Sequence, residues 1–488
     1  MIILHVFLIV AISCPINLKS RNTKIMRIDG HATKICQIED SIVQIMEKAG
    51  IPGISCAIIN DSQIVYEQGF GLRKKDSTLT SDKYTIFNAA SFSKTVFAYL
   101  VMLLSEDGII DLDKPLQEYL EKPLYEYPNY QDLIGDSRAS LITARMVLSH
   151  QTGFPNLRFL TKDGKLKFLF EPGTGFSYSG EGIGLLQMVI EEITGIGLEE
   201  LCKERIFEPF DMNYTSYVWQ ERFEENHAFP HDQYERPRPV QRRHKADAIG
   251  SMLTTAGDYA RFLVGLLNSK GERRNLISSM FEPQIAITSK SKFGPGAWED
   301  TDKYTNIRLS RTLGWGYFKS HFGRAVFHTG HDLGNQNYHV VFLDKGIGAV
   351  LLSNSDNFES AARELFEAII GDTISPFDWL GYPYYDPDKD RTPPPEPVAI
   401  ELEPEVLHKF VGEYTFPGNR TLTIKFDEQN LIISDDGERW LPLSAEAQDK
   451  FFVKGREYEF QFLIDETGIV TGYKLLIEDV EIPGEKIK

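Results

Sequence analysis

Two residues with the chemistry of a nucleophile and its proton acceptor stand three positions apart, Ser91 and Lys94. At the start of a helix this spacing places both side chains on one face, a single turn apart. Serine is a weak nucleophile until a neighbour takes its proton, and a partly desolvated lysine can do so. Unpaired N–H groups at a helix start also favour negative charge. The pair therefore predicts a serine site for acyl transfer.

The Ser-x-x-Lys pattern occurs twice, and the residues around each occurrence indicate whether it is a functional site or a chance match. After Lys94, apolar residues recur at helical spacing and predict a buried helix that begins near Ser91: Val96, Phe97, Leu100, Val101, Leu103 and Leu104. A lysine in the first turn of a buried helix is costly unless it is partnered, which is typical of functional sites. The pattern recurs at Ser289 and Lys292, in a polar stretch with no helix after it. We therefore predict a solvated loop there.

A serine nucleophile also needs a proton carrier for the leaving group and donors for the developing oxyanion. Tyr178 lies in a turn over residues 172–180 that leads into a predicted helix, so its phenol is expected to point into a cleft. Tyr127 and Tyr304 begin Tyr-x-Asn patterns but precede no helix, and we rank Tyr178 above both. Residues 324–331 predict a strand that ends in small residues, whose N–H groups would line the open side of the site.

Composition limits the class of protein. The chain has 488 residues, of which 42% are hydrophobic and 12% aromatic, so two or three domains with large cores are expected. A net charge of −18 argues against a nucleic-acid partner. The four cysteines lack metal-ligand spacing, and Pro230 breaks the helix that His227 and His231 would need as a metal pair. We expect no metal, no cofactor, and a small-molecule or peptide substrate.

The N-terminal residues predict export. Residues 2–12 are nearly all apolar, a run too short to cross a bilayer and typical of a signal-peptide core. We expect a signal peptide over residues 1–20 and a periplasmic or secreted location. Lipid attachment at Cys14 is the alternative, and it would hold the protein at a membrane surface through its N-terminus.

Strands near both ends of residues 21–378 enclose a helical middle. Helices are predicted over 35–49, 184–194, 256–267 and 358–370, and strands over 54–59, 63–68, 325–328, 338–343 and 348–353. This order predicts an α/β (α+β) fold, with one antiparallel sheet flanked by helices and an inserted helical subdomain. The polar stretch 220–244 predicts a surface excursion.

A second domain follows a stiff connection. Residues 379–400 contain three consecutive prolines and predict a linker. Residues 401–488 show short alternating segments separated by turn signals, with nothing helical, which favours a small all-β barrel.

Three motifs occur in order along the chain: Ser91-x-x-Lys94, Tyr178-Ser179-Gly180 and His328-Thr329-Gly330. Together they resemble the serine β-lactamase and penicillin-binding-protein superfamily, and its class C-like branch of esterases and D-aminopeptidases most. Supporting stretches of that branch follow the same order, at 51–55, 147–153, 206–212 and 250–255. The resemblance covers roughly 38–372 and implies a β-lactamase/transpeptidase-like fold. The C-terminal barrel resembles lipocalin-like modules appended to some members.

The resemblance implies a role for each matched residue. Ser91 would be the acylated nucleophile, Lys94 its hydrogen-bonded base or the group that tunes its pKa, and Tyr178 the general base or acid. Whether Lys94 or Tyr178 takes the serine proton stays open, because coupled groups share their titration. His328 would stand where the family usually has lysine, and the backbone N–H groups of Ser91 and His331 would form the oxyanion hole.

The substrate side of the site departs from the family pattern. Thr329, Gly330 and Gly180 would contact substrate, but Gly180 replaces the usual asparagine and removes an amide. Because histidine replaces lysine at 328, we expect turnover to depend on the charge of His328 near neutral pH. Both changes favour an esterase or peptidase over an efficient β-lactamase. The alternative is a penicillin-binding-like binding or assembly protein without catalysis.

Overall fold

The computed structural model describes most of the chain, namely residues 23–161, 163–393, 395, 397–416, 420–434, 437, 440–454, 458–477 and 480–487. The predicted signal peptide and Cys14 lie outside the described residues, so both stay predictions. No helix within the described ranges combines the length and the hydrophobicity needed to span a bilayer.

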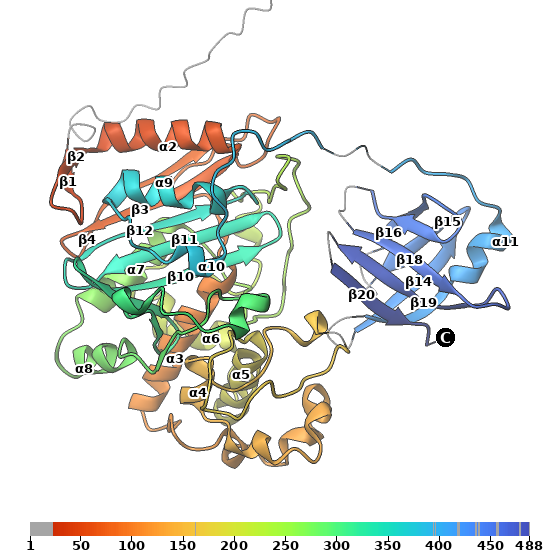
Figure 1. Ribbon diagram of the computed structural model, residues 1–488, viewed down its shortest axis with the longest axis horizontal. Helices are drawn as coiled ribbons and strands as arrows, with labels where there is room; N and C mark the ends of the chain where they lie inside the picture. The colour runs from red at the N-terminus through yellow and green to blue at the C-terminus, as the bar shows by residue number, and fades with distance from the viewer. Residues whose placement is uncertain are drawn as a thin grey trace, which may run out of the picture.

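One antiparallel sheet organises the larger domain (Figure 1). Within the described residues it has eight strands in the order β4-β3-β12-β11-β10-β9-β8-β7. Their bounds are β3 Gly53–Asn60, β4 Gln63–Gly71, β7 Ile285–Ala286, β8 Ser310–Arg311, β9 Gly316–Ser320, β10 Gly323–Asp332, β11 Asn335–Phe342 and β12 Ile347–Ser353. Two further strands, β1 (Lys24–Met26) and β2 (Ala32–Lys34), form a separate hairpin. The strands predicted from the sequence are all present in this domain.

Helices cover both faces of this sheet. Helices α2 (Ile35–Ala49), α9 (Phe358–Ile370) and α10 (Phe377–Leu380) lie on one face, and α3 (Ser93–Glu106), α7 (Ala256–Leu267) and α8 (Gly271–Met280) on the other (Figure 1). Alternate residues of β12 point to opposite sides: Leu351 packs in the core under α2 and α9, and Leu352 in the core under α3. The sheet is therefore buried on both faces, and the predicted layered architecture is confirmed.

The inserted helical part carries the tyrosine of the second motif. It contains α4 (Ala144–Leu148), α5 (Gly180–Thr194) and α6 (Leu198–Cys202) with short 3-10 turns between them. Helix α5 begins at Gly180, four residues before the predicted start, because the Ser179 hydroxyl caps it and accepts the Gly182 N–H at 3.0 Å. Tyr178 therefore stands immediately before the first turn of α5.

The segment 220–244 is only partly a surface excursion. Its Ala228 N–H donates to the Ile86 carbonyl at 2.9 Å, and His227, Pro230 and His231 are buried. Polarity alone predicts exposure, but this segment buries its backbone against the strand that leads to Ser91.

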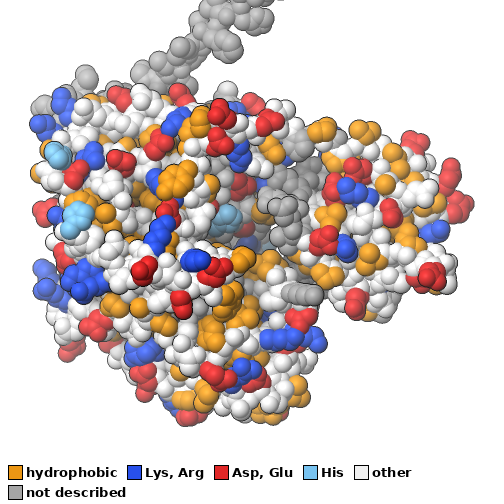
Figure 2. Space-filling model, in the orientation of Figure 1, with side chains coloured by type: hydrophobic (Ala, Val, Ile, Leu, Met, Phe, Trp, Pro, Cys, Tyr) orange, Lys and Arg blue, Asp and Glu red, His pale blue; other side chains and the backbone are white. Residues whose placement is uncertain are grey.

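The C-terminal domain is the predicted all-β barrel. Its described strands run in sequence order: β13 Gly412–Phe416, β14 Arg420–Asp427, β15 Asn430–Ser434, β16 Leu441–Ala445, β17 Lys450–Phe452, β18 Tyr458–Ile464, β19 Val470–Ile477 and β20 Val480–Glu485. The Ile487 N–H donates to the Glu413 carbonyl at 2.7 Å, which nearly closes the barrel. A short helix, α11 (Pro404–Leu407), precedes it, so the prediction of nothing helical over residues 401–488 is wrong at this point. On the face in Figure 2, acidic and basic side chains lie interspersed over both domains.

Candidate active site

Ser91 lies in a tight turn between a short strand and α3. Strand β5 (Phe87–Asn88) pairs with β6 (Leu253–Thr254), and a 3-10 turn (Ala90–Phe92) then leads into α3. Ala90 has a φ of 45°, in the left-handed region that residues with a Cβ rarely adopt. Backbone strain of this kind persists only where the surroundings hold it in place.

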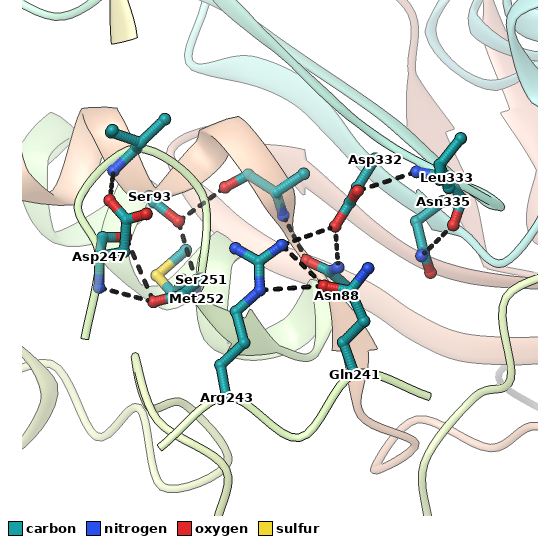
Figure 3. A network of polar contacts seen from close by, with 12 residues as sticks. Asn88, Ser93, Gln241, Arg243, Asp247, Ser251, Met252, Asp332, Leu333 and Asn335 are labelled. Atoms are coloured by element: carbon teal, nitrogen blue, oxygen red, sulfur yellow. Dashed lines mark hydrogen bonds and ion pairs between the residues drawn. The ribbon is translucent and has the colours of Figure 1, made fainter. Parts of the chain in front are cut away.

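A polar network holds this turn (Figure 3). The Asn88 amide oxygen accepts the Ala90 N–H at 2.9 Å, and the Asn88 Nδ2 donates to Asp332 Oδ2 at 3.0 Å. Arg243 Nη2 donates to the same Asp332 oxygen at 3.3 Å. On the other side, the Ser93 hydroxyl donates to the Ala90 carbonyl and accepts the Met252 N–H. The nucleophile turn is therefore fixed from the end of β10 and from the 241–252 segment.

Lys94 reaches Ser91 as the spacing predicts. Its Nζ lies 2.9 Å from Ser91 Oγ and 2.6 Å from the Ile249 carbonyl oxygen, and the residue is 2% exposed. An ammonium group has three donors, and two of them are engaged here. The lysine, in the first turn of α3, is thus desolvated and aimed at the hydroxyl of Ser91 in the preceding 3-10 turn.

Tyr178 is buried over this pair and surrounded by cations. Its ring centroid lies 5.1 Å from Lys94 Nζ, 4.0 Å from Lys292 Nζ and 5.8 Å from Arg311 Cζ. Burial raises the pKa of Tyr178, but the charges of Lys94 and Lys292, the Ser91 hydroxyl and the charge of Arg311 lower it to about 8. The hydroxyl has no aligned hydrogen bond within the described residues, although Ser91 is close enough to affect its pKa.

The prediction of a solvated loop at Lys292 is wrong. The residue is only 8% exposed, and its Nζ lies 3.1 Å from Thr329 Oγ1. Its backbone N–H donates to the Trp379 carbonyl at 2.7 Å, and this contact turns the loop inward. Local sequence cannot show a contact with a residue so distant in the chain.

Two further side chains at the site were not among the predicted site residues. Arg311 on β8 is 2% exposed, and its Nε and Nη2 have no hydrogen-bond partner within the described residues. His150 lies with its ring centroid 4.4 Å from that of Tyr178 and accepts the Ser179 N–H at Nδ1, 3.1 Å away. For His150, the available signal in the sequence was its place inside the supporting stretch 147–153.

His328 is present at the site but not as a cation. It is 2% exposed, with its ring centroid 6.1 Å from that of Tyr178. Its Nδ1 lies 2.7 Å from the Thr329 carbonyl, which can only accept, so this nitrogen carries the proton. Burial, together with Arg311, Lys292 and Lys94, holds its pKa well below the usual value. The prediction that His328 changes its charge near neutral pH is therefore wrong, because this histidine is neutral there.

The remaining predicted residues line the same edge. The pairing of β9 with β10 ends at Phe327, so the strand beyond it faces the Ser91 turn. A Cβ added to Gly330 would meet the Ala89 carbonyl oxygen at 2.5 Å, so only glycine allows this approach. Thr329 is buried beside Lys292, and the side chain of His331 points outward to Glu359, 2.9 Å away. The His331 N–H as an oxyanion donor stays a prediction.

Gly180 shows why the family asparagine is missing. A Cβ there would lie 3.0 Å from both the Asn156 carbonyl oxygen and Ile249 Cγ2. The Gly180 N–H donates to the same Asn156 carbonyl at 2.9 Å. A side chain there therefore requires Asn156 or Ile249 to shift by a few tenths of an ångström, so the surroundings disfavour an asparagine.

A separate cavity of about 660 Å³ lies between the two domains. Both contribute to its wall: Trp219, Asn88 and Asp332 from the larger domain, and Phe452 and Tyr458 from the barrel. Its described lining does not include Ser91, Lys94 or Tyr178, so it borders the network behind the nucleophile turn rather than the reactive groups.

Comparison with known proteins shows the family of the chain. A family model described as Beta-lactamase matches residues 38–371. Penicillin-binding protein 4* of Bacillus subtilis (strain 168) is 22% identical over 431 residues, which span 83% of this chain and 88% of that protein. The chain therefore belongs to the beta-lactamase family, a family of serine hydrolases.

Two solved structures support the fold. The octameric penicillin-binding protein homologue from Pyrococcus abyssi has a TM-score of 0.57 and 22% identity, covering 92% of this chain and 100% of that chain. D-alanine carboxypeptidase AmpC from Burkholderia cenocepacia has a TM-score of 0.54 and 19% identity, covering 69% of this chain and 98% of that chain.

Proposed function

We propose that this serine hydrolase cleaves an amide or ester bond of a peptide or small molecule through an acyl-enzyme on Ser91. One observation carries the proposal: the Lys94 ammonium lies 2.9 Å from Ser91 Oγ, beside a buried phenol whose pKa is lowered to about 8. Acyl transfer requires a nucleophile, here Ser91, and a group within hydrogen-bond reach of it, here Lys94. It also requires a proton acceptor with a pKa near neutral pH, here Tyr178.

In acylation, Ser91 Oγ attacks the substrate carbonyl carbon and its proton passes to the Lys94–Tyr178 pair. We assign the acceptor role to the Tyr178 phenolate, because Lys94 already directs donors at Ser91 Oγ and the Ile249 carbonyl. The carbonyl oxygen becomes an oxyanion, for which the N–H groups of Ser91 and His331 are the proposed donors.

Collapse of this intermediate breaks the bond to the leaving group. The Tyr178 hydroxyl returns its proton to the departing amine or alcohol, and the acyl group remains on Ser91 as an ester. Water then attacks that ester after losing a proton to Tyr178, and Ser91 leaves with the proton. The cycle consumes one water and restores every group.

We place the activity among esterases and peptidases rather than efficient β-lactamases. The glycine at position 180 supports this, since it presents no side-chain amide to a substrate and its surroundings disfavour a side chain. Two similar proteins, a penicillin-binding protein and a D-alanine carboxypeptidase, favour D-amino-acid derivatives and peptides within the panel of substrates.

A substrate panel with Ser91→Ala tests the proposal. p-Nitrophenyl esters, D-aminoacyl anilides and nitrocefin are offered to the wild type, to Ser91→Ala and to Ser105→Ala, a control serine near the end of α3, the helix that follows Ser91. We expect turnover of at least one ester or anilide that Ser91→Ala loses and Ser105→Ala keeps. If all substrates remain intact and fluorophosphonate does not label Ser91, the non-catalytic binding protein is the better description.

A further inference from the structure

The loop 287–300 directs its two lysines in opposite ways. Lys290 is exposed and forms an ion pair with Glu299. Lys292 is buried, because its N–H donates to the Trp379 carbonyl and the Trp379 indole N–H donates to the Ser289 hydroxyl at 3.2 Å. Two contacts with the segment after α9 therefore hold one lysine inward while the other stays in solvent.

The buried ammonium stands between the second and third motifs. Its Nζ is 3.1 Å from Thr329 Oγ1 and 4.0 Å from the ring centroid of Tyr178. The ring of Phe293 lies 4.9 Å from the same nitrogen and meets Tyr178 edge-on at 5.6 Å. A residue outside all three motifs thus contacts the strand motif and the phenol together.

The groups that face Tyr178 come from five elements. Lys94 on α3, Lys292 on its loop and Arg311 on β8 are cations. His150 and His328 also face it, and burial, with the nearby cations, holds the pKa of both histidines well below the usual value. The acidic group that acts on this cluster is Glu359 of α9, whose charge raises the pKa of Lys292.

We propose that Lys292 is a positioning residue of the Ser91 site: from a loop outside the motifs, it supplies the positive charge that His328 lacks and stabilises the anionic form of Tyr178. This inference rests on the proposed function. On β10, the neutral His328 stands where the family usually has a charged lysine. The ammonium of Lys292, in contact with the neighbouring Thr329, supplies that charge from the loop 287–300.

The electrostatics of the cluster agree with this role. Burial lowers the pKa of Lys292 to about 8, so the amine remains mostly protonated at pH 7. The phenol of Tyr178 has its pKa lowered to about 8, with Lys94 and Lys292 as the strongest favourable charges. Each charge therefore stabilises the other, and loss of the lysine should make the phenol a weaker acid.

The test is the pH profile of kcat/KM for a neutral p-nitrophenyl ester. In Lys292→Met we expect the acidic limb to move up by about one pH unit, and kcat/KM at pH 7 to fall about tenfold. Lys290→Met, in the same loop, should leave the profile where it is. An unmoved limb in Lys292→Met would overturn the proposal.

Two further variants separate charge from packing. Lys292→Arg keeps the charge and should keep the position of the acidic limb; a limb displaced as far as in Lys292→Met would show a steric role and refute the inference. The double variant Lys292→Met/His328→Lys returns the charge to the strand and should recover most of the lost activity. No recovery in a folded double variant would also count against it.

A readout without turnover keeps this inference distinct from the proposed function. Ring-carbon NMR of labelled tyrosines, with Tyr178→Phe for assignment, gives the titration of Tyr178 directly. Its midpoint should rise in Lys292→Met and stay in place in Lys290→Met. If Ser91→Ala keeps full hydrolysis, the proposed function fails; if only the Tyr178 midpoint is insensitive to Lys292, the inference alone fails.

Discussion

At the scale of single residues, the protonation of Tyr178 sets the pH dependence that the proposed mechanism requires. Its pKa is lowered to about 8, so the phenolate fraction grows with pH and saturates above that value. A base must be deprotonated to act, so kcat/KM should rise about tenfold per pH unit on the acidic side and level off above pH 8.

Tyr178→Phe tests this assignment. We expect a loss of about 100- to 10,000-fold in kcat/KM and disappearance of the limb near pH 8, since phenylalanine fills the space without an ionisable group. Stopped-flow or steady-state ester hydrolysis from pH 5 to 10 is the measurement. Retention of the same limb in the variant would assign the titration to another group.

The surroundings of Gly180 decide whether the asparagine of the family pattern is tolerated at this position. Because its Cβ position lies 3.0 Å from Asn156 and Ile249 atoms, Gly180→Asn should destabilise the protein by about 1–3 kcal/mol and bring no gain in nitrocefin turnover. Gly184→Ala, on the same helix, has only an ordinary contact at 3.4 Å and should be neutral or stabilising. Denaturant unfolding compares the two, and a tolerated asparagine that hydrolyses nitrocefin would refute the explanation.

At the scale of elements, the turn between β5 and α3 depends on contacts from other segments. Ala90 keeps a positive φ while Asn88 accepts its N–H and Asp332 holds Asn88. We expect Asn88→Ala to lower kcat/KM about 100-fold, since a displacement of the nucleophile by about 1 Å has that cost.

The matched control is Asn268→Ala. Asn268 also donates a side-chain hydrogen bond, to the Ser62 carbonyl at 2.8 Å, but it is exposed and on the far end of α7. Its loss should leave ester hydrolysis within about twofold of wild type. Equal rates for both variants would mean that the Asn88 contact does not position Ser91.

Local patterns predict the elements better than the full site. The helix predicted over 358–370 and the strands predicted over 325–328, 338–343 and 348–353 depend on nearby residues, and both are confirmed as α9 and as β10 to β12. Lys292 was assigned to solvent because its neighbours are polar, whereas a contact with Trp379 turns it inward. Arg311 carries no motif that a single sequence marks as part of a serine site, and His150 lies in a supporting stretch, 147–153, that gives it no role. Charge and long-range packing, rather than periodicity, were the missing information.

At the scale of the whole molecule, the barrel and the larger domain meet around the cavity of about 660 Å³. Phe452 and Tyr458 line it from the barrel, while Ser91, Lys94, Tyr178 and Lys292 all belong to the larger domain. We therefore expect the proposed chemistry to proceed without the barrel, whereas the wall of this cavity needs both domains.

Truncation before residue 398 tests the division. We expect the shortened chain to keep kcat/KM for a small p-nitrophenyl ester within about threefold, and to differ only for bulkier peptides that reach the cavity wall. Circular dichroism and thermal unfolding establish that the shortened chain is folded. Equal changes for small and large substrates in a folded truncation would instead show that the barrel governs access to Ser91.

The central claim is that the Ser91 hydroxyl is an activated nucleophile. A p-nitrophenyl phosphonate ester forms a stable adduct with such a serine, and peptide mass spectrometry locates it. We expect one phosphonyl group per chain, on Ser91, with labelling lost in Ser91→Ala and slowed in Tyr178→Phe. An adduct on another residue, or hydrolysis of esters by a chain that never becomes labelled at Ser91, would contradict the account.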